Sequence, residues 1–315
     1  MKVPTLYIIV PCYNEEAILP STHRLLSDKL TQLTSTGKIS SESRIMFVDD
    51  GSTDQTWNLI KEFHDLNPAV CGIKLSHNFG HQYALLSGME TACKKADAII
   101  SIDADLQDDI GVMAEMLEKY EAGADVVYGV RKNRSSDTFL KRFTAQFFYK
   151  MMKKMGVDTI YNHADYRLMS HRALKAMLKY RERNLYLRGI VPLLGYPNAQ
   201  VYYDRKERLA GESKYPLKRM LHLAMDGITS LSAYPLHLLL MMGFLFLVVA
   251  IIIFIYVIYR FAIGEVVPGW ASLMLSIWFV GGCILLGLGI VGEYIGKIYI
   301  EVKGRPRYEI EEELP

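Results

Sequence analysis

The chain lacks the features that mark several classes of protein. Its formal net charge is only +2, which provides no bulk positive charge for nucleic-acid binding, so we expect no nucleic-acid partner. The four cysteines form no Cys-x-x-Cys pair and are widely spaced, which argues against a disulfide framework or a zinc site and suits a reducing compartment. No basic segment precedes a cleavable apolar stretch near Met1, so we expect no signal peptide.

Two stretches near the C-terminus contain no Asp, Glu, Lys or Arg. One lies between Asp226 and Arg260, and the other runs from Val266 to Gly292. A helix of about 20 residues crosses the hydrocarbon core of a bilayer, and both stretches exceed that length. We therefore predict a C-terminal two-helix transmembrane hairpin over residues 235–260 and 269–295. A helical hairpin buried in a soluble core is the less favoured alternative.

The basic residues around these stretches predict their orientation. The connection between them carries only Arg260, whereas basic residues flank both outer ends: Lys214, Lys218, Arg219, Lys297, Lys303, Arg305 and Arg307. By the positive-inside rule, both termini and the N-terminal domain lie in the cytosol of a multi-pass cell-membrane protein. Residues 213–234 are expected to form a juxtamembrane amphipathic segment, and 296–315 a cytosolic tail whose acidic run, residues 309–313, is solvated.

The N-terminal part alternates strand-like and helix-like segments. Strands are predicted near residues 6–10, 44–48, 72–75, 98–102 and 125–128, and helices near 17–34, 56–66, 82–93 and 110–121. This alternation favours an α/β domain over residues 1–212, with a mostly parallel sheet and helices on both faces. Ligands bind at the carboxyl ends of such strands, so the polar residues that follow them are the candidate site.

The most informative of these strand ends is Ile102-Asp103-Ala104-Asp105-Leu106-Gln107. Residues two apart on a strand share a face, so Asp103 and Asp105 could both bind one hard cation where the strand ends. Carboxylate oxygens suit Mg²⁺ or Mn²⁺, with substrate phosphates and water completing the shell. An isolated Asp-x-Asp is weak evidence, because such pairs are common in solvated loops.

Two further strand ends carry polar residues. The first strand ends in Val-Pro-Cys-Tyr-Asn-Glu-Glu (10–16) and the second in Val-Asp-Asp-Gly-Ser-Thr-Asp (48–54). Glycine permits a tight backbone turn beside a ligand, and acidic side chains can accept hydrogen bonds from a base or ribose. Asp-Asp-Gly-Ser alone would serve equally well as a helix cap or turn. For Cys12, beside this loop, a packing role is favoured over reactivity.

These motifs in this order resemble family 2 glycosyltransferases, specifically the polyprenyl-phosphate hexosyltransferases akin to dolichol-phosphate mannose synthase and the bacterial bactoprenol glucosyltransferases. The resemblance covers most of the chain. It continues through Asn78-Phe79-Gly80 with Ala84 and Gly88, Gly129-Val130-Arg131, Asp165-Tyr166-Arg167-Leu168, and Arg205-x-x-Arg208-x-x-Gly211-x-Ser213-Lys214-Tyr215. It implies a GT-A type fold and inverting, metal-dependent transfer of a hexose, most simply from UDP-glucose or a related UDP-sugar, to polyprenyl (undecaprenyl) phosphate.

The resemblance also implies roles for individual residues. The nucleotide sugar would be bound by Pro11, Tyr13, Glu15, Asp49, Asp50, Asp103 and, from a loop over the site, Ser135. The metal, Mg²⁺ or Mn²⁺, would be held by Asp103, Asp105 and Gln107. Arg131 would place its guanidinium on the diphosphate or on the acceptor phosphate. Asp165 occupies the position of a possible base, and would remove a residual proton or orient the acceptor or sugar.

The acceptor imposes an electrostatic requirement. A phosphate monoester with a second pKa of about 6 is already largely anionic at neutral pH, so a strong base is not needed. Bringing this anion toward an anionic donor calls for positive charge, which Arg205, Arg208 and Lys214 are expected to supply. The alternative for these three is a solvated basic loop attracted to anionic lipid headgroups.

Other features are less decisive. Phe139, Phe143, Phe147 and Met151 recur every four residues among basic side chains, which fits a helix on the membrane surface or one packed on the sheet. His81 and His163 are interpreted as structural. Two protein partners are considered. One is a second copy of this chain, packed through the glycines of the second apolar stretch, and the other is a lipid-sugar flippase in the same pathway. A processive polysaccharide synthase is disfavoured because Gln-x-x-Arg-Trp is missing, and a non-catalytic sensor of nucleotide sugars because all three metal-motif residues are present.

Overall fold

The computed structural model describes residues 3–132, 163–183, 186–204, 234–264 and 269–315. Its contacts divide the chain into two units. The first, here called the sheet domain, comprises Met1–Met220 and Arg305–Pro315, and the second, the helical unit, comprises Leu221–Gly304. Ser135, Arg205, Arg208 and Lys214 lie outside the described residues, as do the aromatic segment 139–151 and residues 213–233 of the predicted juxtamembrane segment 213–234.

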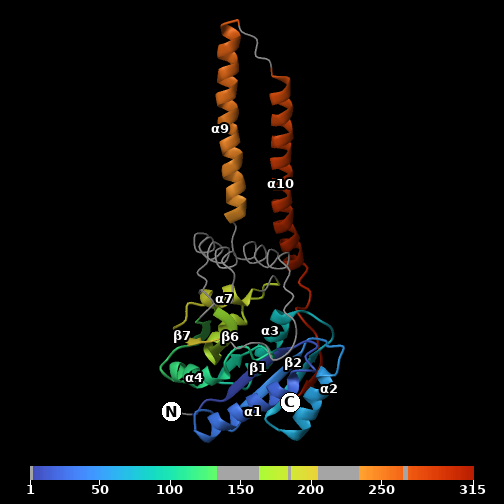
Figure 1. The fold of residues 1–315 in the computed structure, drawn as a ribbon, viewed down its shortest axis with the longest axis vertical. Coiled ribbons are helices and arrows are strands. Elements are labelled where there is room, and N and C mark those ends of the chain that lie inside the picture. The colour runs from blue at the N-terminus through green and yellow to red at the C-terminus, as the bar shows by residue number, and fades with distance from the viewer. Residues whose placement is uncertain (1–2, 133–162, 184–185, 205–233, 265–268) are drawn as a thin grey trace. The chain divides into compact units, whose positions relative to one another are not determined.

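One eight-stranded sheet forms the sheet domain (Figure 1), in the spatial order β7-β5-β6-β4-β1-β2-β3-β8. The strands are β1 (Leu6–Cys12), β2 (Arg44–Asp49), β3 (Val70–Leu75), β4 (Ala98–Ser101), β5 (Val126–Arg131), β6 (His163–Ser170), β7 (Asn198–Tyr203) and β8 (Ile310–Leu314). The central strands β4, β1, β2 and β3 are parallel. Two strands run against them: β6, between β4 and β5, and β8, at the edge beside β3.

Helices cover both faces of this sheet. In chain order they are α1 (Leu19–Ser35), α2 (Thr56–Leu66), α3 (His81–Ala92), α4 (Met113–Glu121), α6 (His171–Met177) and α7 (Leu187–Leu193), with a 3₁₀ turn, η1, at Ile110–Val112. The bounds match the sequence predictions to within a few residues for the first four strands and four helices. The prediction of a mostly parallel sheet with helices on both faces is confirmed.

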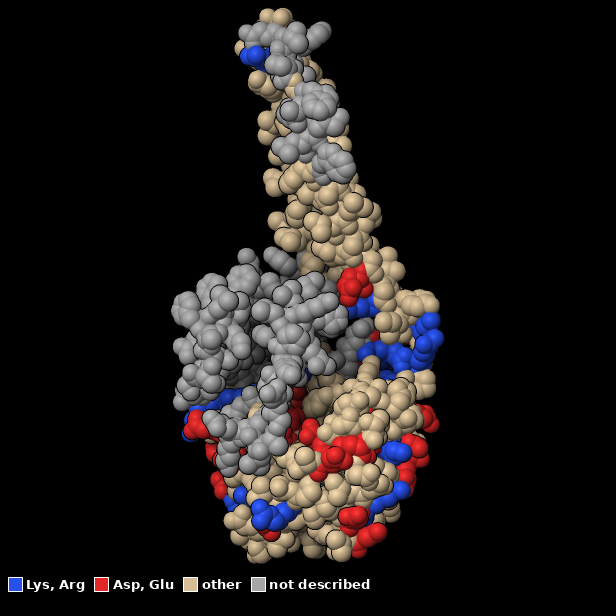
Figure 2. All heavy atoms as spheres, turned by 45° about the vertical axis from the view of Figure 1, so that its right-hand side comes forward, with Lys and Arg blue, Asp and Glu red and all other residues tan. Residues whose placement is uncertain are grey.

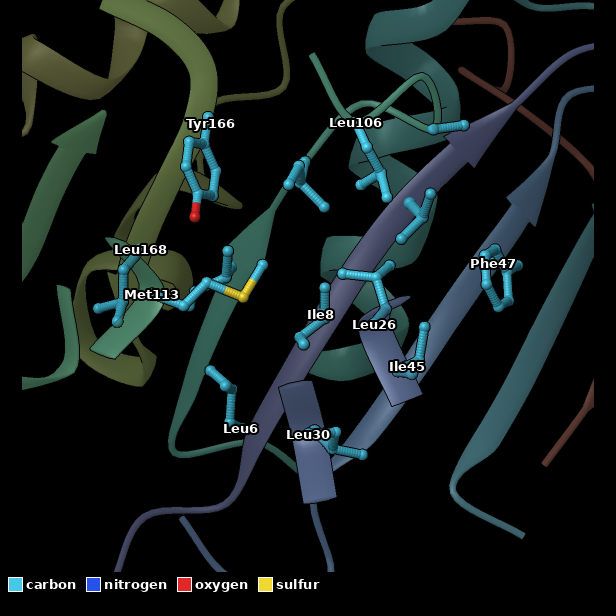
Figure 3. Packing of buried hydrophobic residues seen from close by; sticks show 14 of the residues in the cluster. Leu6, Ile8, Leu26, Leu30, Ile45, Phe47, Leu106, Met113, Tyr166 and Leu168 are labelled. Carbon is cyan, nitrogen blue, oxygen red and sulfur yellow. The ribbon is translucent and has the colours of Figure 1, made fainter. Parts of the chain in front are cut away.

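The core has two layers because alternate residues of a strand point to opposite faces. In β1, Leu6, Ile8 and Val10 join the cluster formed with α1, α2 and α4. Tyr7 and Ile9 join the other, formed with α3, α6 and α7. Figure 3 shows part of the first cluster, where Leu26 and Leu30 of α1 pack on Ile8 and Ile45. Burial on both faces explains why these strands are continuous apolar runs.

Close packing on the second face depends on a glycine in α3. A Cβ on Gly88 would lie 2.6 Å from Ile9 Cγ2 and 2.8 Å from Val48 Cγ2. The helix can therefore approach β1 and β2 only because residue 88 has no side chain. Cys12 is buried at the end of β1, which confirms the packing role expected for it.

The helical unit contains α9 (Tyr234–Ala262) and α10 (Trp270–Val302). Both contain a segment long and apolar enough to cross a membrane, Pro235–Arg260 with mean hydropathy 3.3 and Phe279–Val302 with 1.7. Figure 2 shows a contrast between the units, since charged side chains are scattered over the visible face of the sheet domain and are few along the two helices. Within the unit, the rings of Phe246 and Phe279 meet edge to face at 5.9 Å.

The prediction of a solvated acidic tail is wrong. α10 continues to Val302, past the predicted end at 295, and the acidic run then forms β8, which pairs antiparallel with β3. Trp57 Nε1 donates to Glu312 at 2.9 Å, and Lys61 and Lys74 pair with Glu312 and Glu311 at 2.8 and 2.9 Å. Three glutamates lie between Ile310 and Leu314, and two of them, Glu311 and Glu312, find basic partners on β3 and α2.

Candidate active site

Most of the residues predicted to bind the nucleotide sugar lie at the ends of β1 and β2, which are neighbours in the sheet, or directly after them. Pro11 pairs with Val48, so both strands end at the same level. The loop after β1 is joined to the loop after β2 by backbone-to-side-chain hydrogen bonds. Asn14 N–H donates to Ser52 Oγ, Thr53 N–H to Asn14 Oδ1 and Glu15 N–H to Thr56 Oγ1, each at 2.9 Å. The exposed ring of Tyr13 is carried on this joined pair of loops.

Asp49 and Asp50 are both buried, and their carboxylates are used within the fold. Asp50 accepts from the backbone N–H groups of Phe79 and Gly80 at 2.8 and 2.9 Å, so it holds the loop that leads into α3. Asp49 accepts a longer hydrogen bond from Ser52 N–H at 3.3 Å. Burial raises the pKa of both carboxyl groups, and these hydrogen bonds oppose that shift.

Gly51 makes this arrangement possible. Its φ is +67°, and a Cβ there would lie 2.5 Å from the carbonyl carbon of His77. The turn after β2 and the loop after β3 are therefore in backbone contact at a position that only glycine can occupy.

Asp103 and Asp105 lie in a turn and not on a strand, because β4 ends at Ser101. The prediction that they share a strand face is therefore wrong, although they do follow the central strand. Leu106 between Asp105 and Gln107 has a φ of +46°, an uncommon conformation for a residue with a side chain. Asp105 Oδ1 accepts from Gln107 N–H at 3.2 Å, which closes the turn.

The metal motif fits a divalent cation in two respects. Gln107 Oε1 is a buried acceptor without a hydrogen-bond partner in the part of the chain that the structure describes. Desolvation raises the pKa of Asp103, His81 opposes that shift, and the neighbouring carboxylates of Asp165, Asp108 and Asp105 add to it. A cation relieves such crowding of negative charge. Within the described residues, no three His, Cys, Asp or Glu side chains are grouped to hold a metal ion.

Asp165 is brought to the same edge by β6. This strand runs antiparallel to β4, with Arg167 opposite Ser101, so Asp165 lies level with the residues that follow β4. His81, the first residue of α3, stands between the two carboxylates: its Nε2 is 3.7 Å from Asp103 Oδ1 and 3.8 Å from Asp165 Oδ2. The interpretation of His81 as a purely structural residue missed this position. For His163, only its place at the start of β6 is described.

Two arginines pair with Asp165, and sequence reasoning identified neither as a site residue. Arg167 is fully buried, and its Nη2 lies 2.5 Å from Asp165 Oδ1. Arg188 of α7, half-exposed, donates from Nε to both carboxylate oxygens at 3.2 Å and from Nη2 to Oδ2 at 2.9 Å. Asp165 and Arg167 are two residues apart on β6 and share one face, so their spacing could have indicated an ion pair. Nothing in the sequence indicates that Arg188 joins them.

Arg131 is the last residue of β5, and its guanidinium is held by hydrogen bonds to Asp108. Its Nε and Nη2 donate to Asp108 Oδ1 at 3.3 and 3.1 Å, and Tyr203 Oη donates to the same oxygen at 2.7 Å. Asp108 directly follows Gln107 of the metal motif, so this buried carboxylate links the motif to the ends of β5 and β7. Burial alone would lower the pKa of Arg131, but Asp108 raises it, and the side chain stays cationic.

Comparison with known proteins identifies close relatives. A model of the family described as Glycosyl transferase family 2 matches residues 7–178. YkoT of Bacillus subtilis (strain 168), named as an uncharacterized glycosyltransferase, is 49% identical over 99% of this chain and 92% of its own length. The SfII prophage-derived bactoprenol glucosyl transferase of Shigella flexneri is 40% identical over 96% of both chains.

Among solved structures, one similar fold is that of glucosyl-3-phosphoglycerate synthase from Mycobacterium tuberculosis, in complex with Mn²⁺, UDP and phosphoglyceric acid. It has a TM-score of 0.48 and 16% identity, covering 72% of this chain and 77% of that one. The sequence relatives, in contrast, match along nearly the whole chain, which includes both apolar helices.

Proposed function

Because this chain belongs to glycosyl transferase family 2 and is a glycosyltransferase with a GT-A type sheet domain, we propose that it transfers a hexose from a nucleotide sugar to a polyprenyl phosphate. The observation that carries the proposal is the 40% identity to a bactoprenol glucosyl transferase over 96% of both chains. That match includes both the sheet domain and the two apolar helices. The sheet domain would bind the water-soluble donor, and the helices would hold the enzyme at the membrane that contains the lipid acceptor. UDP-glucose, or a related UDP-sugar, is the favoured donor.

In this proposal the donor lies across the carboxyl ends of β1, β2 and β4. The joined loops after β1 and β2, with Tyr13 and Glu15, form the nucleotide side, and Asp50 shapes it by fixing the backbone of Phe79 and Gly80. Asp103, Asp105 and Gln107 would hold a divalent cation, which stabilises the negative charge that develops on the leaving nucleoside diphosphate. Arg131, held by Asp108, presents a further positive charge at this edge.

The acceptor phosphate supplies the attacking oxygen, and transfer occurs with inversion in a single displacement. Asp165 carries two guanidinium partners and is therefore better suited to accepting a hydrogen bond than to removing a proton. The proposed acceptor charges Arg205, Arg208 and Lys214, like Ser135 on the donor side, lie outside the described residues. The two apolar helices would anchor the enzyme in the membrane, with the sheet domain on the cytosolic side.

The test is transfer of label from radiolabelled nucleotide sugars into an organic-extractable lipid. Purified full-length protein is given undecaprenyl phosphate, Mg²⁺ or Mn²⁺ and one donor at a time, with EDTA as the control. We expect label in the lipid from one UDP-sugar and its loss with EDTA. Label in a product that grows by many sugars would favour a processive synthase, and donor binding without transfer to any lipid would favour a sensor.

A second experiment tests the acceptor side. Arg208→Ala should raise the KM for undecaprenyl phosphate while leaving the KM for the donor nearly unchanged, because the lost charge would face the acceptor. Lys218→Ala is the matched control, since it removes a basic residue nearby in the sequence that has no proposed role in binding the acceptor. Equal acceptor kinetics in wild type and Arg208→Ala would return this residue to a general membrane-surface charge.

A further inference from the structure

We propose that Arg188 is a positioning residue that fixes the Asp165 carboxylate as the hydrogen-bond acceptor for a hydroxyl of the donor sugar, an inference that rests on the proposed hexosyl transfer. Arg188 and Asp165 come from α7 and β6, and they meet beside Asp103 and His81 at the carboxyl edge of the sheet. The Asp165 side chain is 16% exposed and that of Arg188 42%, so the pair lines the edge without being sealed inside.

The contact between Arg188 and Asp165 is a fork and not a single bond. Nε and Nη2 of the guanidinium address both carboxylate oxygens, at 3.2 and 2.9 Å. Arg167 approaches Oδ1 from the buried side. A carboxylate held by two planar donors cannot rotate freely about its terminal torsion, so its remaining acceptor directions are fixed in space.

Arg188 is itself held in place through the backbone of the residue before it. Leu187 N–H donates to Gln82 Oε1 of α3 at 2.9 Å, and Leu187 C=O accepts from Arg167 Nη1 at 3.3 Å. The start of α7 is thus attached both to α3, next to His81, and to β6. These two hydrogen bonds aim Arg188 at Asp165 and join three separate elements around one carboxylate.

This environment decides what Asp165 can do chemically. Burial would raise its pKa, but the charges of Arg188 and Arg167 outweigh burial and hold the pKa of Asp165 well below its usual range. An ionised carboxylate with so low a basicity accepts hydrogen bonds and removes protons poorly. Its ligand must therefore offer a hydrogen-bond donor.

Of the two proposed substrates, the nucleotide sugar and the lipid phosphate, only the nucleotide sugar offers several hydrogen-bond donors. A phosphate monoester with a second pKa of about 6 is mostly a dianion at neutral pH, and a dianion is an acceptor that a carboxylate repels. A hexose carries several hydroxyl donors. The chemistry of Asp165 therefore matches the sugar of the donor, and its fixed direction would favour a sugar with a hydroxyl at that place.

Binding of UDP-glucose and UDP to the full-length protein tests this inference, because UDP lacks the sugar. We expect wild type to bind UDP-glucose more tightly than UDP. Arg188→Gln and Asp165→Asn should each remove most of that difference and leave UDP affinity unchanged. The double variant should be no worse than either single one, because Arg188 acts through Asp165. Arg188→Lys, which keeps the charge but not the fork, should recover only part of the difference.

Arg172→Gln is the matched control. Arg172 makes the same kind of fork with Asp125, which precedes β5 at the opposite edge of the sheet. It should affect neither ligand. In lipid transfer, we expect Arg188→Gln to lower kcat by up to about 10²-fold, as misplacement of a substrate by about 1 Å can do.

Several outcomes would overturn the inference: equal wild-type affinity for the two ligands, a parallel loss of UDP affinity in Arg188→Gln, full recovery in Arg188→Lys, or additive losses in the double variant. These readouts need no lipid. A wild type that discriminates UDP-glucose from UDP but labels no lipid would count against the proposed function and leave the role of Arg188 intact.

Discussion

Asp49 and Asp50 lie at the end of β2, Asp103 and Asp105 follow β4, and the two pairs have different surroundings. Asp50 is buried and already occupied by two backbone N–H groups, and Asp49 by one. The Asp103 side chain is 41% exposed and lies among other carboxylates, with the orphaned amide oxygen of Gln107 nearby in the turn. One pair holds loops together, whereas the other lies in a turn where neighbouring carboxylates raise the pKa of Asp103.

The difference shows how one residue type serves two purposes at one sheet edge. A buried carboxylate that accepts backbone hydrogen bonds is a fixed part of the scaffold, and its loss leaves unpaired donors. A carboxylate that stays open beside like charges costs stability until a ligand neutralises it. Four substitutions test this contrast.

Of the four substitutions, Asp105→Asn should have the largest effect, and we expect it to lower activity without lowering stability. Removing one of the two carboxylates proposed to bind the metal should lower transfer by at least about 10²-fold, the upper range for loss of a residue that only supports a ligand. Thermal unfolding should be unchanged or slightly improved, because like-charge crowding is relieved. Asp109→Asn is the control, since asparagine keeps the oxygen that accepts from Gly111 N–H. Near-normal transfer by Asp105→Asn would remove this residue from the metal site.

Gly51→Ala should destabilise the fold more than any other of these four substitutions, because Gly51 lies in the turn that follows Asp49 and Asp50. The left-handed conformation alone costs about 1–3 kcal/mol for a residue with a side chain. The new Cβ would in addition press on the backbone of His77, only 2.5 Å away. Gly37→Ala separates the two effects, because Gly37 has a similar φ of +69° and open space around it. Denaturant unfolding that gives equal losses for both variants would show that the contact with His77 is unimportant.

Asp50→Asn should destabilise the sheet domain by about 1–3 kcal/mol, the range for leaving a buried hydrogen-bonding group unsatisfied. Asparagine offers one oxygen for the two N–H groups of Phe79 and Gly80, and its own NH₂ would face the second. The exposed Asp65→Asn is the control in the same unfolding measurement. An effect on transfer without any loss of stability would mean that Asp50 contacts the nucleotide directly.

Glu312→Gln should have the smallest effect, because it tests an acidic residue that is held at the surface. Glutamine retains an acceptor for Trp57 Nε1 and loses the ion pair with Lys61, whose side chain is 41% exposed. We expect a slight fall in the midpoint of thermal unfolding at low salt that disappears at high salt. Lys38→Met, which breaks the comparable surface pair with Glu118, is the control. A large, salt-independent loss would place Glu312 with Asp50 in the scaffold.

Part of this organisation was predictable from local pattern. Continuous apolar strands, such as residues 6–10 and 44–48, predicted a sheet buried on both faces, and the polar residues after them predicted the site edge. The apolar stretches predicted α9 and α10 with nearly correct starts. The acidic run near the C-terminus was misjudged because its partners, Trp57, Lys61 and Lys74, are more than 200 residues away in sequence.

The sequence by itself determined the fold class, the family and the edge of the sheet at which the chemistry belongs, because hydrophobic periodicity and short motifs are local properties. Only the tertiary structure decided how the acidic residues are divided between scaffold and site, since that depends on which groups from distant segments reach each carboxylate. His81 and Arg188 illustrate this. No local pattern places either one beside Asp165, and they reach that carboxylate because α3 and α7 begin next to it.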